Sequence, residues 1–338
     1  MDLLKKPLPV GLVVVAAVGL TAYTRVRRTI KRKLALVEKA NTKYAPFSHT
    51  SSYVPVAIFV GGTSGIGQGM AEAFAKYTKG NAHIILIGRN VTAAHAIIAK
   101  FPKPTAAAAK HEFIYCDASL MKDIDRLTGE LLARIPKINF LVLSTMEFAS
   151  LGREDTQEGV DSKMALAYYG RVKFTTSLAP ALQMARKGGE DATVHYVAAP
   201  GRGKPINWED LSMKKSYAIR SVPSYLDTIL QELAPRHRNF TFIHAWPGLV
   251  RTGLVRDAPL PYRLYFNLMA TINPWALSHT ESGEFMVRAM WQTADRPGVW
   301  SVDEYGDKLP EGSVRVASEE ERSKLWEHTV EVTSLKSA

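Results

Sequence analysis

The sequence predicts an α/β fold with a doubly wound parallel sheet of about seven strands, and three observations support this prediction. Short apolar runs alternate with longer helical patterns from residue 56 to residue 302. Several of these runs, residues 56–60 among them, are apolar at every position, which is typical of strands buried on both faces. A glycine-rich turn joins residues 56–60 to a helical pattern, as in folds that bind nucleotides at the end of a strand.

The composition is that of an ordinary globular protein, with 46% hydrophobic and 22% charged residues. Its one cysteine, Cys116, excludes an intrachain disulfide, and no spacing of His and Cys predicts a metal site. The net charge is +11, but residues 1–43 hold ten Lys or Arg against two acids. Because the rest of the chain is nearly balanced, we expect no nucleic-acid surface on the main domain.

The N-terminal segment predicts a hydrophobic membrane anchor over residues 1–24. Residues 7–24 carry no charge, and a helix of that length rises about 27 Å, against about 30 Å for a hydrocarbon core. The basic flank that follows would keep the C-terminal side in the cytosol, with the endoplasmic reticulum as the expected membrane. Prolines and glycines in the run leave a shallow, monotopic insertion open beside a single-pass span. Residues 25–53 are interpreted as the basic flank and a linker.

The remaining elements are predicted in chain order from the length and period of the apolar pattern. Runs of five or six residues predict strands, and patterns with a period near 3.6 predict helices. The main domain is assigned to residues 54–315 and a C-terminal helical tail to residues 316–338. The predicted strands cover residues 56–60, 83–88, 112–116, 139–143, 192–197, 240–244 and 298–302, and predicted helices lie at 70–76, 93–101, 120–135, 154–184, 214–233, 281–291 and 319–331.

The turn after the first strand is the predicted site of a dinucleotide. Glycines let the backbone turn tightly and approach a pyrophosphate, and the N-terminus of the next helix offers unpaired N–H groups. The candidate cofactor-binding residues of this turn are Gly61, Thr63, Ser64, Gly65, Ile66 and Gly67.

The end of the second strand predicts the type of dinucleotide. Arg89 and Asn90 follow this strand, where such folds meet the adenosine ribose. An acid there would bind the ribose 2′-hydroxyl of NAD, whereas an arginine can pair with the 2′-phosphate of NADP. No acid stands near, so the predicted cofactor is NADP.

From residue 56 to about residue 306 the chain resembles the short-chain dehydrogenase/reductase family. The sequences of several segments resemble those of divergent fungal members, which often serve in specialised metabolite pathways. The resemblance rests on the G-x-x-x-G-I-G spacing, on Asp117 after the third strand and on the Pro-Gly-Leu-Val-Arg-Thr run at residues 247–252. It implies a Rossmann-like domain, Asp117 beside the adenine, and Val250 and Thr252 near the nicotinamide. Asp117 could instead have a structural role, because Asp117 or Ser119 could cap the next helix.

The family's catalytic set of Asn, Ser, Tyr and Lys is only partly matched. The resemblance points to Tyr217, at the start of the helix predicted after strand five, as the proton donor or acceptor. Ser221 stands four residues later, where the family has its lysine. Arg220 and Lys214 lie on adjoining parts of that predicted helix, and either could supply the missing positive charge.

The serine and asparagine of the family are missing as well. The serine falls at Ala198 or Ala199 and the asparagine near Ala167. Ser144 or Thr145, at the end of the fourth strand, could replace the serine, and an ordinary loop hydroxyl is the alternative.

Two further features need an interpretation. A second Tyr-x-x-x-Lys, Tyr169 to Lys173, precedes strand five and is interpreted as a coincidence. Residues 259–277 are rich in Tyr, Phe, Leu, Met and Trp. They could cover a bulky apolar substrate, dip into a bilayer surface, or pack on the body.

The sequence therefore predicts a membrane-anchored, NADP-dependent oxidoreductase that acts on a carbonyl or alcohol of an apolar small molecule. The residues predicted for catalysis are Tyr217, Arg220 and Ser144. The incomplete set keeps two alternatives open, a catalytically silent nucleotide-binding scaffold or sensor and an isomerase or dehydratase on the same fold. Family members are often dimers or tetramers, so the resemblance leaves a homodimer open.

Overall fold

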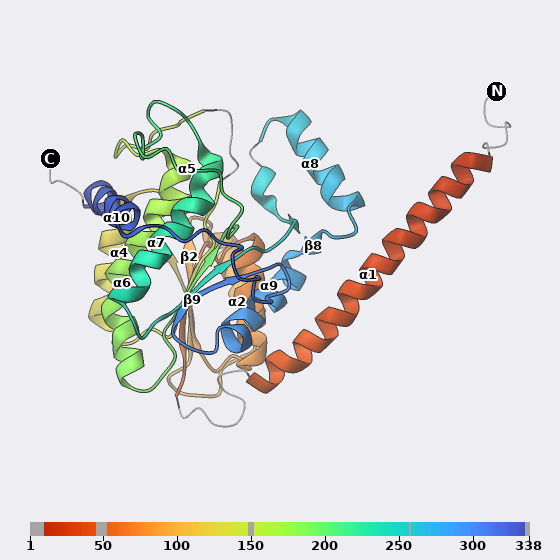
Figure 1. Ribbon diagram of the computed structural model, residues 1–338. Helices are drawn as coiled ribbons and strands as arrows, with labels where there is room; N and C mark the ends of the chain where they lie inside the picture. Colours follow the sequence, from red (N-terminus) through yellow and green to blue (C-terminus); the bar gives the residue numbers. More distant parts are fainter. Residues whose placement is uncertain (1–9, 45–52, 148–151, 257, 335–338) are drawn as a thin grey trace.

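The computed structural model describes residues 10–44, 53–147, 152–256 and 258–334 (Figure 1). A seven-stranded sheet with the order β3-β2-β1-β4-β5-β6-β9 forms its centre, and every neighbouring pair is parallel. The predicted doubly wound parallel sheet is confirmed. Chain order reverses between β1 and β4, and the carboxyl ends of strands beside such a reversal form a crevice that binds ligands.

The strands lie within two residues of their predicted positions. Mostly apolar character identifies the central strands because both faces of the sheet are covered there, whereas β3, at the sheet edge, is polar and less buried. A separate pair of two-residue strands, which the apolar pattern did not predict, is formed by β7 and β8. The strands of the main sheet are β1 (Val56–Val60), β2 (His83–Gly88), β3 (Lys110–Tyr115), β4 (Phe140–Leu143), β5 (Thr193–Val197), β6 (Thr241–Ala245) and β9 (Gly298–Val302), and the small pair is β7 (Val250–Arg251) and β8 (Leu277–Ser278).

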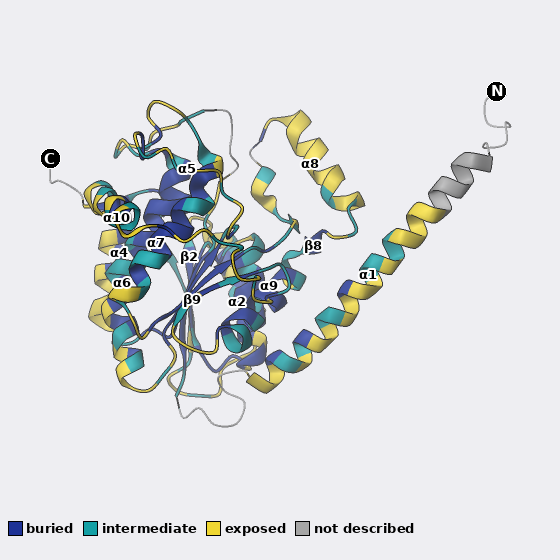
Figure 2. Cartoon of the chain, viewed as in Figure 1, coloured by how far each residue is buried: buried dark blue, intermediate teal, exposed yellow. Residues whose placement is uncertain are grey.

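Helices cover both faces of the sheet, and the two apolar cores lie between them and the strands (Figure 2). One face carries α4 (Met121–Arg134), α5 (Ser162–Met164), the π-helical turn η1 (Ala165–Tyr169), α6 (Gly170–Lys187), α7 (Val222–Arg236) after the 3-10 turn η2 (Ile219–Ser221), and α10 (Glu319–Thr333). The other carries α1 (Val10–Tyr44), α2 (Gly65–Tyr77), α3 (Val91–Ile98), α9 (His279–Arg288) and the π-helical turn η4 (Ala289–Thr293). The 3-10 turn η3 (Gly253–Val255) and α8 (Leu260–Ile272) follow β7.

The helix α1 is longer than the predicted anchor and continues through the basic flank to Tyr44. Its second half packs on α9, where Ile30 and Val37 are buried and Arg27 forms an ion pair of 2.5 Å with Glu281. Among the described residues, no helix is both long and apolar enough to cross a membrane. The predicted anchor falls partly on residues 1–9 and the predicted linker partly on residues 45–52, which lie outside the described residues.

Two glycines let α2 and α9 approach each other at the backbone. A Cβ atom at Gly69 would lie 2.0 Å from the carbonyl oxygen of His279, and one at Gly283 would lie 2.2 Å from the carbonyl carbon of Gly69. Both distances are far shorter than any allowed contact. Small residues are therefore required at this crossing, and the crossing sets the position of α2 on the sheet.

We predict that Gly69→Ala lowers the free energy of unfolding by about 3 kcal/mol, because the new methyl group overpacks a contact between two backbones. Gly129→Ala is the matched control, since nothing lies within 4 Å of a Cβ atom there. Alanine inside an exposed helix should stabilise the protein by about 0.5–1 kcal/mol. Urea denaturation of both variants measures the two effects, and equal stability of the two would contradict the prediction.

Candidate active site

The turn after β1 lies against the end of β4. Gly61 has φ +84° and donates its N–H to the carbonyl oxygen of Ile87 over 2.9 Å. A Cβ atom at Gly61 would lie 2.8 Å from Ser144 Oγ, and one at Gly67 would lie 2.5 Å from the carbonyl oxygen of Gly61. The turn thus has room for glycine only, and its backbone is exposed to whatever binds at this edge of the sheet.

The N-terminus of α2 is open toward the same edge. Ser64 is the residue before the helix, and its hydroxyl makes no capping bond. The first turn of α2 holds no acid, and the first N–H groups of a helix have no partner within it. An anionic group is favoured at such a helix end. Thr63 lies beside the end of β2, since a Cβ atom at Gly88 would be 3.0 Å from its Oγ1, and Ile66 packs partly against the core.

Arg89 follows β2 at the same edge. Its side chain is 63% exposed, and its Nη1 lies 3.7 Å from Asp117 Oδ2. Asn90 caps α3, because its Oδ1 accepts the N–H of Ala93 over 2.9 Å. The structure therefore brings Arg89 and Asp117 together and gives the Asn90 side chain a role in the helix terminus.

The structure also decides the alternative reading of Asp117. Asp117 Oδ1 accepts from the N–H and the hydroxyl of Ser119, at 3.0 and 2.7 Å. Neither residue caps α4. The carboxylate of Glu158 takes that place, accepting from the N–H groups of Met121 and Lys122 at 2.6 and 3.0 Å.

The segment after β6 reaches the glycine turn from the other side. Thr252 Cγ2 would lie 3.2 Å from a Cβ atom at Gly65, which has φ +57°. Val250 is held in β7 by its pairing with Leu277 in β8. Chain segments nearly 200 residues apart are thus joined at the start of α2.

Ser144 and Thr145 both lie at the end of β4, and their hydroxyl groups are engaged. Ser144 Oγ donates to the carbonyl oxygen of Val60 at 3.1 Å, and Thr145 Oγ1 donates to that of Leu166 at 2.8 Å. Ser144 therefore lies directly under the glycine turn, while its hydroxyl keeps an acceptor site.

The prediction that Tyr217 begins a helix is wrong. The segment before it is a turn, because the Asp210 carboxylate accepts from the N–H groups of residues 214, 215 and 216 at 2.7–2.9 Å. The helix α7 begins only at Val222, with Pro223 in its first turn. Proline suits the first turn of a helix, since its missing N–H is not needed there.

The Tyr217 hydroxyl is buried and, among the described residues, has no hydrogen-bond partner. Burial raises the pKa of Tyr217, and the nearby carboxylates of Asp161, Glu154 and Glu147 raise it further. The phenol is protonated at neutral pH, and the raised pKa makes it a weaker acid than a solvent-exposed tyrosine.

Neither of the two cations predicted to replace the lysine is held on a helix with Tyr217. The side chains of Lys214 and Arg220 are exposed, and Lys214 lies in the turn.

Lys163 is a residue near Tyr217 that the sequence analysis did not identify. Its side chain is 2% exposed, its Nζ lies 5.9 Å from the centre of the Tyr217 ring, and it contacts Gly152 O and Glu154 at 3.4 Å each. No sequence signal connects a lysine to a tyrosine 54 residues later.

Arg171, in α6, is a second residue that the sequence analysis missed. It is fully buried, and its Nη1 and Nη2 donate to Val197 O and Thr145 O at 2.8 and 2.6 Å. Burial lowers the pKa of this guanidinium to about 10, so it stays charged at neutral pH. Arg171 joins the carboxyl ends of β4 and β5, next to the alanines that stand where the family has its serine. The only signal in the sequence is an arginine within a mostly apolar helical pattern.

The second Tyr-x-x-x-Lys is used in packing. Tyr169 is buried, with its hydroxyl 2.8 Å from His328 Nε2 of α10. Lys173 forms an ion pair of 2.7 Å with Asp125 of α4. The two side chains therefore bind neighbouring helices, in agreement with the interpretation as a coincidence.

Comparison with known proteins agrees with this geometry. A family model described as short chain dehydrogenase matches residues 55–199. Oxidoreductase AN1596 of Emericella nidulans is 31% identical over 235 residues, which cover 68% of this chain and 69% of that protein. Human polyprenol dehydrogenase is 25% identical over 297 residues, covering 83% of this chain and 85% of that protein.

Two solved structures share the fold. The RhlG/NADP complex of Pseudomonas aeruginosa matches with a TM-score of 0.55 and 16% identity, covering 75% of this chain and 95% of that one. L-Sorbose reductase of Gluconobacter frateurii, complexed with NADPH and L-sorbose, matches with a TM-score of 0.52 and 21% identity, covering 76% and 97%.

We predict that Gly65→Ala weakens NADPH binding at least about tenfold, or about 1.4 kcal/mol. The alanine must adopt a left-handed conformation, and its methyl group contacts Thr252. The double variant Gly65→Ala/Thr252→Ser removes Thr252 Cγ2 and should recover part of the affinity. Fluorescence titration gives both values, and unchanged affinity in the single variant would argue against this cofactor position.

Proposed function

This chain belongs to the short-chain dehydrogenase/reductase family and is an oxidoreductase of that type that uses a nicotinamide cofactor, and from that premise we propose an NADP-dependent enzyme acting on an apolar carbonyl or alcohol. The cofactor would supply or accept hydride at nicotinamide C4. The substrate carbon would exchange that hydride, and its oxygen would exchange a proton with the protein.

Arg89 is the observation that carries the choice of NADP. It follows β2 at the edge that also holds the glycine turn, and its exposed guanidinium faces Asp117. A guanidinium can form paired hydrogen bonds with a phosphate. Since no acid stands beside Arg89 in the sequence to bind the ribose 2′-hydroxyl of NAD, the site favours the 2′-phosphate of NADP.

Tyr217 is the proposed proton donor for reduction of a carbonyl. Its hydroxyl is buried without a partner among the described residues, so a substrate oxygen would complete its hydrogen bonding. As hydride reaches the carbonyl carbon, the phenolic proton passes to the carbonyl oxygen, and the phenolate that remains takes a proton from solvent. Lys163 lies near enough to the ring to stabilise that phenolate, and its buried side chain is held in place.

An apolar substrate and attachment to a membrane complete the proposal. The apolar residues of α8 follow β7 and Thr252 at the site edge, and the human relative is named for its action on a polyprenol. We further propose that the uncharged N-terminal segment holds the enzyme at a membrane, with the active site toward the cytosol and the endoplasmic reticulum as the location.

A catalytically silent nucleotide-binding scaffold or sensor is the second candidate. One observation favours it: alanines stand at the positions of the family's serine and asparagine, and Ser221 stands at the position of its lysine. Turnover separates the two candidates, since both would bind the nucleotide.

We predict that Arg89→Ala weakens NADPH binding at least about tenfold, or about 1.4 kcal/mol, and leaves NADH binding unchanged. The loss follows from the missing pairing with the 2′-phosphate. Arg126→Ala, at an exposed arginine of α4, is the matched control and should change neither affinity. Equal losses for both nucleotides in Arg89→Ala would show that Arg89 does not read the 2′-phosphate.

We predict that Tyr217→Phe lowers turnover at least about 100-fold, as expected for loss of a positioned acid. NADPH affinity should be unchanged, and stability should not fall because the lost hydroxyl has no partner among the described residues. Transfer of deuterium from labelled NADPH to a panel of apolar ketones measures turnover. Tyr115→Phe, at an exposed tyrosine, is the control and should stay active. A fully active Tyr217→Phe variant would refute the assignment.

A further inference from the structure

The helix α8 exposes large apolar side chains around its whole circumference, and it has no buried residue (Figure 2). Residues 260–275 carry a single charge, that of Arg263. A soluble protein rarely leaves such a surface uncovered, and such patches mark contacts with other molecules or membranes. The exposed fractions lie between 49% and 60% for Leu260, Tyr262, Leu264, Tyr265, Leu268, Ile272 and Trp275.

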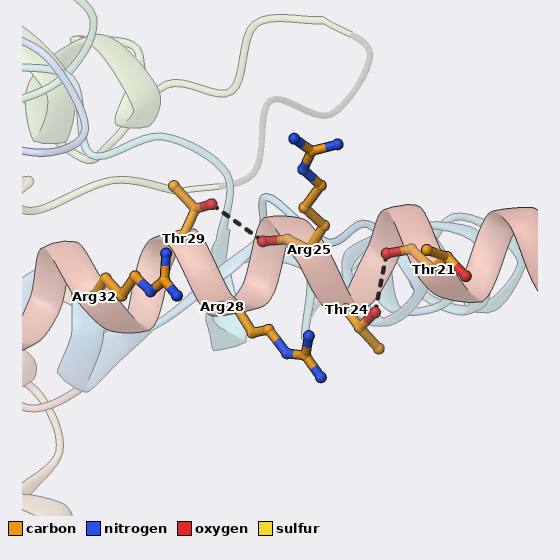
Figure 3. Close-up of a pocket in the computed structure, with 6 residues that line it drawn as sticks. All are labelled: Thr21, Thr24, Arg25, Arg28, Thr29 and Arg32. Carbon is orange, nitrogen blue, oxygen red and sulfur yellow. Dashed lines mark hydrogen bonds between the residues drawn. The ribbon is translucent and has the colours of Figure 1, made fainter.

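The helix α1 carries a basic face. Arg25, Arg28 and Arg32 are spaced three and four residues apart and so share one side of the helix. The three arginines and three threonines line a hollow of about 460 Å³, and Figure 3 shows these six side chains along one stretch of the helix. Within the part of the chain that the structure describes, none of the three arginines forms an ion pair. Arg27, on the opposite face, binds Glu281 instead.

One contact holds α1 at the segment that follows α8. Arg27 Nη1 donates to the carbonyl oxygen of Ala276 over 3.2 Å, only four residues beyond the end of α8. Trp275, which is 56% exposed, precedes that contact. The face of α1 opposite to the three arginines is therefore held at the segment that follows α8, and α8 and the N-terminal half of α1 extend from the same side of the molecule (Figure 1).

We propose that α8 and the basic face of α1 form one docking surface for a bilayer that contains anionic lipids. The apolar side chains of α8 would enter the boundary of the acyl chains, as those of interfacial helices do. Arg25, Arg28 and Arg32 would bind lipid phosphates, which guanidinium groups pair with well. The inference rests on the proposed function, since it would let an apolar substrate pass from the bilayer to the site edge beside Thr252.

The charges favour a bilayer over a second copy of this chain. A two-fold contact through α8 would place the same patch of each copy against the other. The basic face of α1, which extends from the same side of the molecule as α8, would then come near the same basic face of the other copy, and the like charges would oppose association. An anionic surface has the opposite charge over the same area.

Binding of the full chain to sedimenting vesicles tests the basic face. Wild-type protein should bind vesicles with 30% phosphatidylserine at least tenfold more tightly than vesicles of phosphatidylcholine alone, and high salt should weaken that preference. The variant Arg25→Glu/Arg28→Glu/Arg32→Glu should lose at least tenfold of the affinity for the anionic vesicles. Equal binding of this variant and the wild type would overturn the proposal.

A charge-matched control uses Lys122→Glu/Lys187→Glu/Lys324→Glu, on exposed positions of α4, α6 and α10. It changes the net charge by the same amount but on other helices, so it should keep most of the wild-type binding. A loss as large as that of the arginine variant would show attraction by net charge alone and would also overturn the proposal.

The apolar part is tested by Leu264→Ser/Leu268→Ser/Ile272→Ser, whose exposed positions should leave the fold intact. This variant should lose at least tenfold of its affinity for both kinds of vesicle. Met184→Ser/Val316→Ser, at exposed apolar positions elsewhere, is the control and should bind as the wild type does. Unchanged vesicle binding by the α8 variant would exclude α8 from the docking surface.

Two further measurements distinguish failure of the docking proposal from failure of the proposed function. Sedimentation equilibrium shows whether the α8 variant turns a dimer into a monomer, and that result together with unchanged vesicle binding would assign α8 to a second copy. NADPH titration of the same preparations tests the proposed function independently. Loss of NADPH binding with normal vesicle binding would refute the function alone, and the reverse pattern would refute the docking surface alone.

Discussion

The close approach of three backbone segments at the end of β1 is the constraint on which the site depends. Ser144 donates both its N–H and its hydroxyl to the carbonyl oxygen of Val60, so the end of β4 is held against the glycine turn. Only glycine fits at Gly61 and Gly67 beside it. Because the turn carries no side chains there, the N-terminus of α2 stays open to an anionic ligand.

Next to this turn, the buried guanidinium of Arg171 holds the ends of two strands together. Arg171 satisfies the carbonyl groups at the ends of β4 and β5 with two short hydrogen bonds. A buried guanidinium costs solvation, and its hydrogen bonds to two carbonyl groups offset part of that cost. It therefore joins two strands at the place where Ala198 and Ala199 offer no hydroxyl. Tyr217 and Lys163, which approach each other, come from two different segments.

The two faces of helix α1 differ in what they contact. One face packs against α9, through buried Ile30 and Val37 and the ion pair of Arg27 with Glu281. Its opposite face holds arginines without such partners among the described residues. A helix with one face packed on the body and another left basic fits the proposed contact with an anionic surface, and α8 adds an exposed apolar surface on the same side of the molecule.

The sequence by itself determined the strands, the sheet and the glycine turn, because fully apolar runs and glycines reflect local needs, namely burial on both faces and backbone conformations closed to other residues. The sequence also placed Arg89 and Asp117 at the shared edge, since each comes just after a strand whose carboxyl end lies there, and the family resemblance pointed to Thr252. Tertiary structure alone decided the surroundings of Tyr217. The Asp210 carboxylate accepts hydrogen bonds from the N–H groups of the segment that was predicted to begin a helix. Lys163, 54 residues earlier in the chain, lies near the Tyr217 ring. Such contacts depend on which segments the folded chain brings together, and the spacing of residues in the sequence does not predict them.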